Sequence, residues 1–233
     1  MKMNLRKSIF VMLFCAGVIG LHAQTAQEIL QKAREAWTVH EHLSLEVDVK
    51  LYEKASSPAT LLGTAVMRKS GSNYYSKFLD NEMLSTASGA VILDHTSRQI
   101  TWLPDEGKRR RKQQFEPQID SISPNDSVVY LGLKDNVHQL EIYHRSGYIT
   151  KTVFQLSAST FLPEKVVYYY APANEEDDPG AYKSELVYKN ISFEPVKSDL
   201  FSEKKYIVRS GDAVKPAPAY ASYKVIAAKP HKQ

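Results

Sequence analysis

The order of apolar and polar residues predicts one helix followed by many short strands. Apolar side chains recur every three or four residues from Ile29 to Trp37, which is the spacing of a single apolar helix face. Thr25 is followed three residues later by Glu28, the pattern of a capping box that opens a helix. The pattern therefore predicts a helix over residues 26–39.

From Leu43 onward, apolar and polar residues alternate, so the period changes from helical to two. That period predicts strands with one buried face and one solvent face. The loops between most of them are short, which favours antiparallel neighbours. The predicted strands are 43–52, 61–69, 74–79, 82–86, 91–94, 99–103, 127–133, 139–144, 149–157, 165–170, 183–193 and a last one at 206–209, with one helical turn at 198–201.

These elements predict an α+β fold, with one N-terminal helix followed by about ten to twelve meandering antiparallel strands. A sheet of this length curls, and its concave side must be filled. Helix 26–39 and the aperiodic segment 104–127 are the expected helical and loop plugs. If they fill the concavity only in part, an apolar pocket results.

Residues 1–23 have the pattern of a secretory signal peptide. Lys2, Arg6 and Lys7 precede an apolar run, and Ala23 is a small residue before the expected cut. We therefore expect a periplasmic protein that is soluble after cleavage, with an uncleaved signal anchor as the alternative. The only cysteine, Cys15, lies in this segment, so no disulfide is expected.

The remaining chain is predicted to hold a single domain over residues 24–210. Residues 211–233 are rich in proline, alanine, lysine and tyrosine and are predicted to be a partly ordered tail.

Charge excludes some partners and suggests others. The net charge of the chain is +4, and three of the positive charges lie in the signal, so the rest carries about +1. That balance gives no case for nucleic acid as a partner. The basic run Lys108, Arg109, Arg110 and Arg111 is predicted to contact lipid headgroups or an acidic partner, with a solvated loop as the alternative.

No catalytic or metal motif is present. The chain has no Gly-x-Ser-x-Gly nucleophile turn, and its only cysteine lies in the signal. His40 and His42 have no third ligand at a suitable spacing. We therefore expect neither an enzyme nor a metal or other cofactor.

Four stretches of the chain together resemble the LolA-like family of periplasmic outer-membrane lipoprotein-sorting proteins. They are the opening 26–47, the segment 100–111 with its Trp-Leu-Pro and basic run, 160–166 with Leu-Pro, and 188–201. The resemblance implies a half-open antiparallel β-barrel whose apolar cavity, closed by helices, binds acyl chains of lipoproteins or another lipid. Arg68 and Arg98 are the candidates for the lid-closing arginine of these carriers.

Apolar residues of the helix and of the first strands are predicted to line this cavity, with plain core packing as the alternative. These residues are Trp37, Leu45, Val47, Val49, Val66, Tyr74, Phe78, Leu93 and Trp102. The alternative function is a periplasmic protein-interaction module with a filled barrel, in which a sheet edge or the 104–127 loop binds an envelope protein.

Overall fold

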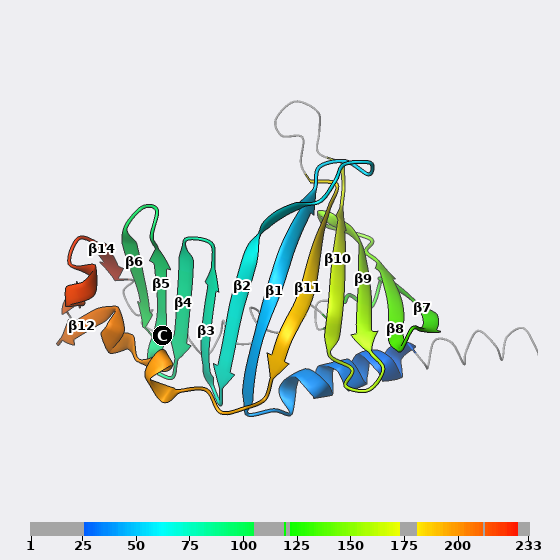
Figure 1. Ribbon diagram of the computed structural model, residues 1–233. Helices are drawn as coiled ribbons and strands as arrows, with labels where there is room; N and C mark the ends of the chain where they lie inside the picture. The colour runs from blue at the N-terminus through cyan, green and yellow to red at the C-terminus, as the bar shows by residue number, and fades with distance from the viewer. Residues whose placement is uncertain (1–25, 105–118, 120–121, 173–180, 212, 228–233) are drawn as a thin grey trace, which may run out of the picture. The chain divides into compact units, whose positions relative to one another are not determined.

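A computed structural model describes residues 26–104, 119, 122–172, 181–211 and 213–227 (Figure 1). Its helix spans residues 26–38. The strands are β1 His42–Tyr52, β2 Thr60–Ser70, β3 Asn73–Phe78, β4 Asn81–Thr86, β5 Gly89–Asp94, β6 Gln99–Pro104, β7 Ser127–Lys134, β8 Val137–Tyr143, β9 Ile149–Ser157, β10 Pro163–Tyr170, β11 Lys183–Ser192, β12 Ile207–Ser210, β13 Ala213–Pro216 and β14 Lys224–Ala227. Short 3₁₀ helices are η2 Ser198–Phe201, η3 Glu203–Lys205 and η4 Pro218–Tyr220.

Twelve strands form one sheet in the order β14-β6-β5-β4-β3-β2-β1-β11-β10-β9-β8-β7. Different strands stand at its two ends, so the sheet does not close on itself. β14 pairs with β6 in parallel, whereas the pairs from β6 to β1 and from β10 to β7 are antiparallel. The predicted fold class, a large open antiparallel sheet with an N-terminal helix, is confirmed.

One strand prediction is wrong. The strand predicted at 206–209 is not the last, because β13 and β14 follow it, and β14 adds to the edge of β6. Both additions have only four residues, and the prolines and alanines around them hide any alternation. Residues 213–227, which the sequence assigned to a partly ordered tail, thus form two strands and η4.

The chain divides into two compact units. The first unit comprises residues 1–37, 52–57 and 119–185, and the second comprises 38–51, 58–118 and 186–233. In the first unit the helix crosses one face of the strands β8 to β10 (Figure 1). Its apolar residues Ile29, Ala33 and Trp37 are buried, and so are the cross-strand partners Leu140 and Phe154. The helix stripe read from the sequence is therefore the core-facing side.

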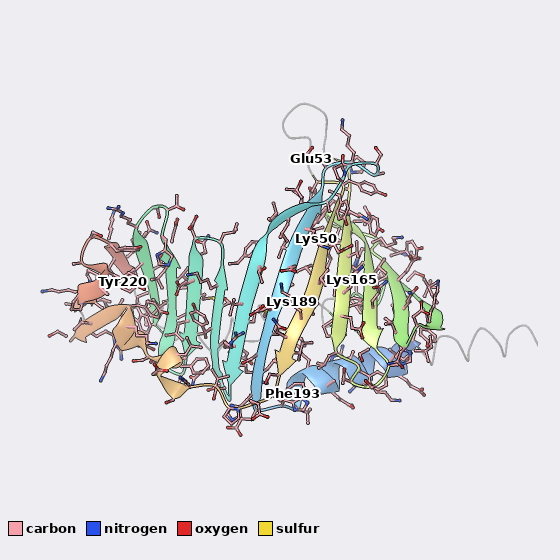
Figure 2. The ribbon with its side chains drawn as sticks, viewed as in Figure 1. Lys50, Glu53, Lys165, Lys189, Phe193 and Tyr220 are labelled. Atoms are coloured by element: carbon pink, nitrogen blue, oxygen red, sulfur yellow. The ribbon has the colours of Figure 1, made fainter. Side chains whose placement is uncertain are left out.

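The second unit has its own core, on one face of β4, β5 and β6. Leu84, Val91, Leu93, Ile100 and Trp102 pack there against side chains from the C-terminal segment, which are Phe201, Tyr206 and Ile207. Tyr223 and Tyr220, the latter labelled in Figure 2, lie at the margin of this core. Gly89 allows this packing, because a Cβ at that position would lie 2.6 Å from the Trp102 ring. The chain's own C-terminal segment therefore covers this face.

Candidate functional site

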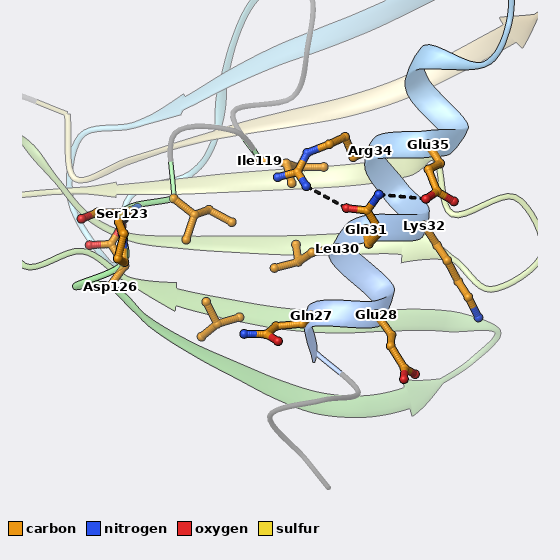
Figure 3. Close-up of a pocket in the computed structure, with 13 residues that line it drawn as sticks. Gln27, Glu28, Leu30, Gln31, Lys32, Arg34, Glu35, Ile119, Ser123 and Asp126 are labelled. Atoms are coloured by element: carbon orange, nitrogen blue, oxygen red, sulfur yellow. Dashed lines mark hydrogen bonds between the residues drawn. The ribbon is translucent and has the colours of Figure 1, made fainter. Parts of the chain in front are cut away.

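A groove of about 760 Å³ runs along one flank of the helix in the first unit (Figure 3). Its size is within the range of sites that hold a small ligand. The apolar part of its lining is formed by Leu30 of the helix, Ile119, Ile122 and Pro124 of the segment before β7, and Val128 of β7. The groove is therefore built by two parts of the chain that are about ninety residues apart.

Polar side chains form the helix wall of the groove. Arg34 Nη1 donates to Gln31 Oε1 over 2.9 Å, and Gln31 Nε2 donates to Glu35 Oε1 over 2.8 Å (Figure 3). These pairs are three and four residues apart, the spacing at which side chains on a helix meet. The helical geometry thus holds the Arg34 guanidinium beside the groove.

Asp126 fixes the opposite wall. Its carboxylate accepts hydrogen bonds from the backbone N–H of Ser123 at 2.9 Å, from that of Arg145 at 3.3 Å and from His144 Nδ1 at 3.0 Å. His144 Nε2 lies 2.9 Å from Thr152 Oγ1 on β9. The Ser123 N–H, with His144 and Arg145, outweighs the effect of burial and holds the pKa of Asp126 below its ordinary value. The wall segment is therefore anchored to the sheet.

The register of the second unit divides the predicted cavity residues between the two faces of its sheet. Residues opposite each other in a ladder share a face, as do residues two apart. Leu45 pairs with Met67, and Met67 pairs with Ser76, so one face carries Leu45, Val47, Val49, Tyr74 and Phe78. Val66 pairs with Glu46 and Lys77, so it lies on the other face, which also carries Leu93 and Trp102.

The predicted cavity residues also differ in how deeply they are buried. Leu45 and Val47 are buried, whereas Val49, Tyr74 and Phe78 are half-buried. Leu93 and Trp102 belong to the core that the C-terminal segment covers. Trp37 is buried in the first unit, on the helix. The basic residues Lys108, Arg109, Arg110 and Arg111 lie outside the described residues.

The two arginines that the resemblance singled out have backbone roles. Arg68 Nη1 donates to the carbonyl oxygens of Leu45 at 2.9 Å and Met67 at 2.8 Å. Arg98 has a φ of 51° in the turn between β5 and β6, and its carbonyl oxygen accepts from Lys224 N over 2.9 Å. Arg68 thus ties β2 to β1, and Arg98 ties that turn to β14.

The groove residues were not predicted from the sequence, apart from Leu30 as a member of the apolar helix stripe. Ile119 and Ile122 lie in a segment without periodicity, and Val128 follows the ordinary alternation of a strand. The available signal was the aperiodic segment 104–127 itself, because long irregular segments inside a domain often serve binding.

Among the residues that the structure describes, no group of three or more His, Cys, Asp or Glu side chains is arranged to hold a metal ion. Within the same residues, no helix has the length and apolar character needed to cross a membrane.

No protein-family model and no curated protein matches this chain. Solved structures are similar at low identity. MucB is 13% identical, with a TM-score of 0.45, and the match covers 83% of this chain and 66% of MucB. A LolA superfamily protein from Nitrosomonas europaea is 14% identical, with a TM-score of 0.26, covering 76% of this chain and 97% of that one.

The lipoprotein LppX from Mycobacterium tuberculosis is 8% identical, with a TM-score of 0.42, covering 75% of this chain and 98% of LppX. The LolA superfamily, which the sequence resembles, is thus among the similar structures.

Proposed function

We propose that this chain is a periplasmic, non-enzymatic carrier that binds acyl chains of lipoproteins or another lipid and takes part in outer-membrane lipoprotein sorting. The observation that carries the proposal is the groove beside the helix, with Leu30, Ile119, Ile122 and Val128 in its lining. Transfer of an acyl chain from water to an apolar surface gains about 0.8 kcal/mol per buried methylene. The apolar part of the groove lining can therefore hold an acyl chain without any cofactor.

Three further features support this proposal. The first 23 residues have the pattern of an export signal, which fits a periplasmic location. The face of β1 and β3 that carries Leu45, Val47, Val49, Tyr74 and Phe78 is a proposed second apolar surface for the ligand. Lys108, Arg109, Arg110 and Arg111 are proposed to contact headgroups or a partner.

A titration tests lipid binding at the groove. The purified, delipidated protein is titrated with cis-parinaric acid, a fatty acid whose fluorescence rises on leaving water. Val128→Lys places a charge in the groove and is expected to weaken binding at least about tenfold, because a buried unpaired charge is costly. The matched control is Leu131→Lys on the same strand, where the side chain is 54% exposed and does not line the groove.

Two outcomes contradict the proposal. One is a folded, lipid-free protein that shows no saturable binding. The other is an equal loss of affinity in Val128→Lys and Leu131→Lys, which would locate binding outside the groove.

A protein-interaction module is the second candidate function, and β7 favours it. This strand ends the sheet order, and Val129, Leu131 and Leu133 on it are exposed. Exposed sheet edges accept a further strand from another protein. If Leu131→Lys abolishes crosslinking to an envelope protein and leaves lipid binding unchanged, the edge serves a partner.

A further inference from the structure

A second groove, of about 560 Å³, lies in the second unit beside η3. The end of β4 and the turn that follows it form one part of its lining, and residues 201–209 of the C-terminal segment form the other. Its size is within the range of sites that hold a small ligand. Three charged side chains, Glu203, Lys204 and Arg209, line it, so their charges decide which ligands it accepts.

Two hydroxyl groups orient the Glu203 carboxylate. Thr86 Oγ1 and Ser88 Oγ both donate to the same oxygen, Glu203 Oε1, from 117 and 115 positions earlier in the chain. Within the part of the chain that the structure describes, Glu203 Oε2 has no hydrogen-bond or ion-pair partner. A carboxylate offers about four lone-pair sites. Glu203 can therefore still accept a hydrogen bond from a cationic group of a ligand.

The two cations of the lining are exposed. Arg209 Cζ lies 5.2 Å from the centroid of the Trp102 ring, and this cation–π contact places the guanidinium beside the groove. Among the described residues, neither Lys204 nor Arg209 forms an ion pair with a carboxylate, that of Glu203 included. An anionic group can therefore bind both cations without displacing a carboxylate.

Apolar side chains adjoin these charges. Phe201 and Ile207 line the groove and are buried, whereas Val208 also lines it and is 50% exposed. A ligand with an apolar part removes the Val208 surface from water, which a small hydrophilic ion does not. The groove thus combines one anionic site, two cationic sites and an apolar wall.

A ligand that satisfies both kinds of charge must keep its own charges apart, because Glu203 does not itself pair with either cation. The two-carbon linker of phosphoethanolamine separates an ammonium from a phosphate in this way. In an α-amino acid both charged groups are on the same carbon. The planar fork of Arg209 also matches two oxygens of a phosphate.

We infer that the groove beside η3 binds the zwitterionic headgroup of a phospholipid of the phosphatidylethanolamine class. The ammonium binds Glu203, the phosphate binds Arg209 and Lys204, and the start of the acyl part contacts Val208. This groove shares no lining residue with the carrier groove of the first unit. The inference therefore does not depend on the proposed carrier function.

Two soluble lipids that differ in one charged group test the assignment. Dihexanoyl phosphatidylethanolamine and dihexanoyl phosphatidylglycerol share their chains and their phosphate, and only the first has an ammonium. Trp37→Phe leaves Trp102 as the only tryptophan, so the one remaining indole N–H resonance reports on the second unit. Its shift is followed while each lipid is added below its micelle concentration. Phosphatidylethanolamine is expected to bind about tenfold more tightly.

Substitutions at the two charged ends separate their contributions. Glu203→Gln keeps an oxygen for Thr86 and Ser88 and removes the charge. It is expected to weaken phosphatidylethanolamine about tenfold and not to weaken phosphatidylglycerol. Arg209→Gln is expected to weaken both lipids about tenfold, because both carry the phosphate, and Arg209→Lys is expected to have an intermediate effect.

The matched controls change charges next to the groove and outside its lining. Lys205 Nζ lies 3.7 Å from Asp199 Oδ2, and neither residue lines the groove. Lys205→Gln and Asp199→Asn are each expected to leave both affinities within about twofold. Circular dichroism melts show whether each variant is folded. An equal loss in Lys205→Gln and Arg209→Gln would overturn the phosphate contact, because it would reduce the effect to the general field of the segment.

Two further outcomes would overturn the inference. If the two lipids bind equally and Glu203→Gln changes neither affinity, Glu203 does not bind the ammonium. If neither lipid shifts the Trp102 resonance, the groove binds no phospholipid headgroup. The carrier function is then still judged by its own titration with cis-parinaric acid.

O-phosphoethanolamine, which has the same headgroup and no acyl chains, distinguishes a lipid from a free headgroup. Binding at least about tenfold weaker than that of the lipid supports the lipid, because the difference measures the apolar contact. Equal binding would overturn the assignment to a lipid and identify a small free zwitterion as the ligand.

Discussion

The two compact units cover their sheet faces in different ways. In the first unit a helix crosses the strands β8 to β10, and a groove of about 760 Å³ lies along its flank. In the second unit an extended C-terminal segment with η2, η3 and η4 packs aromatic side chains against the face that carries Val91 and Trp102. A smaller groove, of about 560 Å³, lies beside η3 and is lined by Phe201, Ile207 and Arg209. Among the described residues, the two units thus differ in the element that covers the sheet and in the size of the groove beside it.

The shape of the covering element explains the difference. A helix is a cylinder about 10–12 Å wide, and it contacts a sheet along one stripe of side chains. Among the described residues, the space beside that stripe is lined by Ile119, Ile122 and Val128 and is still a groove. A segment of strands and short turns can instead follow the sheet, so that Phe201, Tyr206 and Tyr220 reach its face from separate points along the chain.

Removing a core side chain gives the largest expected effect and tests whether the units are independent. Phe154→Ala empties a position that is 1% exposed in the first unit, and such changes cost about 3–5 kcal/mol of unfolding free energy. The chain has two tryptophans, Trp37 in the first unit and Trp102 in the second. In a Trp102→Phe background, the fluorescence of Trp37 during urea unfolding reports on the first unit. In a Trp37→Phe background, the fluorescence of Trp102 reports on the second unit.

If Phe154→Ala shifts only the Trp37 transition, the units unfold separately. A shift of equal size in both transitions would contradict that independence and make the chain one cooperative body.

Deleting residues 211–233 is expected to have the next largest effect and to act on the second unit alone. The deletion removes Val214, Tyr220, Tyr223 and Val225, which pack at the margin of that core. Counting somewhat under 1 kcal/mol for each half-buried side chain gives a loss of about 3 kcal/mol. The Trp102 transition measures it, and binding of cis-parinaric acid should be unchanged. A deletion without effect on stability would mean that β14 contributes no net packing energy.

Substitution of Glu82 is expected to have a smaller effect on the stability of the second unit, and this effect depends on pH. Burial raises the pKa of this carboxyl, but hydrogen bonds from Lys77, His95 and Tyr75 outweigh burial, so the pKa lies below its ordinary value of 4.5. A carboxylate with a depressed pKa stabilises the fold above its ordinary pKa, and the stabilisation is lost as the pH falls through the lower folded value.

The expected result is a second unit that loses stability below about pH 4.5. Glu82→Gln is expected to reduce that dependence and to cost about 1–2 kcal/mol at pH 7; part of the dependence should remain, because the pKa values of Asp48 and Asp94 in the same unit are also lowered. Urea unfolding of the Trp102 signal between pH 3 and 7 measures both. The Trp37 signal is the control, because it reports on the first unit, whose acid dependence comes from its own carboxyls, such as Asp126, and should not change in Glu82→Gln. If the second unit of Glu82→Gln loses as much stability at low pH as the unmodified protein does, Glu82 is not a cause of that loss.

Local pattern was enough to find most of the fold. The helix at 26–38, β9 and η2 follow from periodicity and turn residues, because each period depends on neighbouring residues alone. β13 and β14 were missed because strands of four residues show too few alternations to be recognised. The resemblance to LolA-like proteins gave the fold class and did not give the position of the groove.

The sequence by itself determined the helix, the strands and which side of each is apolar, since these depend on the spacing of residues along the chain. Only the tertiary structure decided what lies on each apolar side. It set Ile119 and Val128 beside Leu30, and it placed the C-terminal segment over Trp102. Such contacts join residues about ninety or more positions apart, and their free energy depends on the shapes that meet, which no local period records.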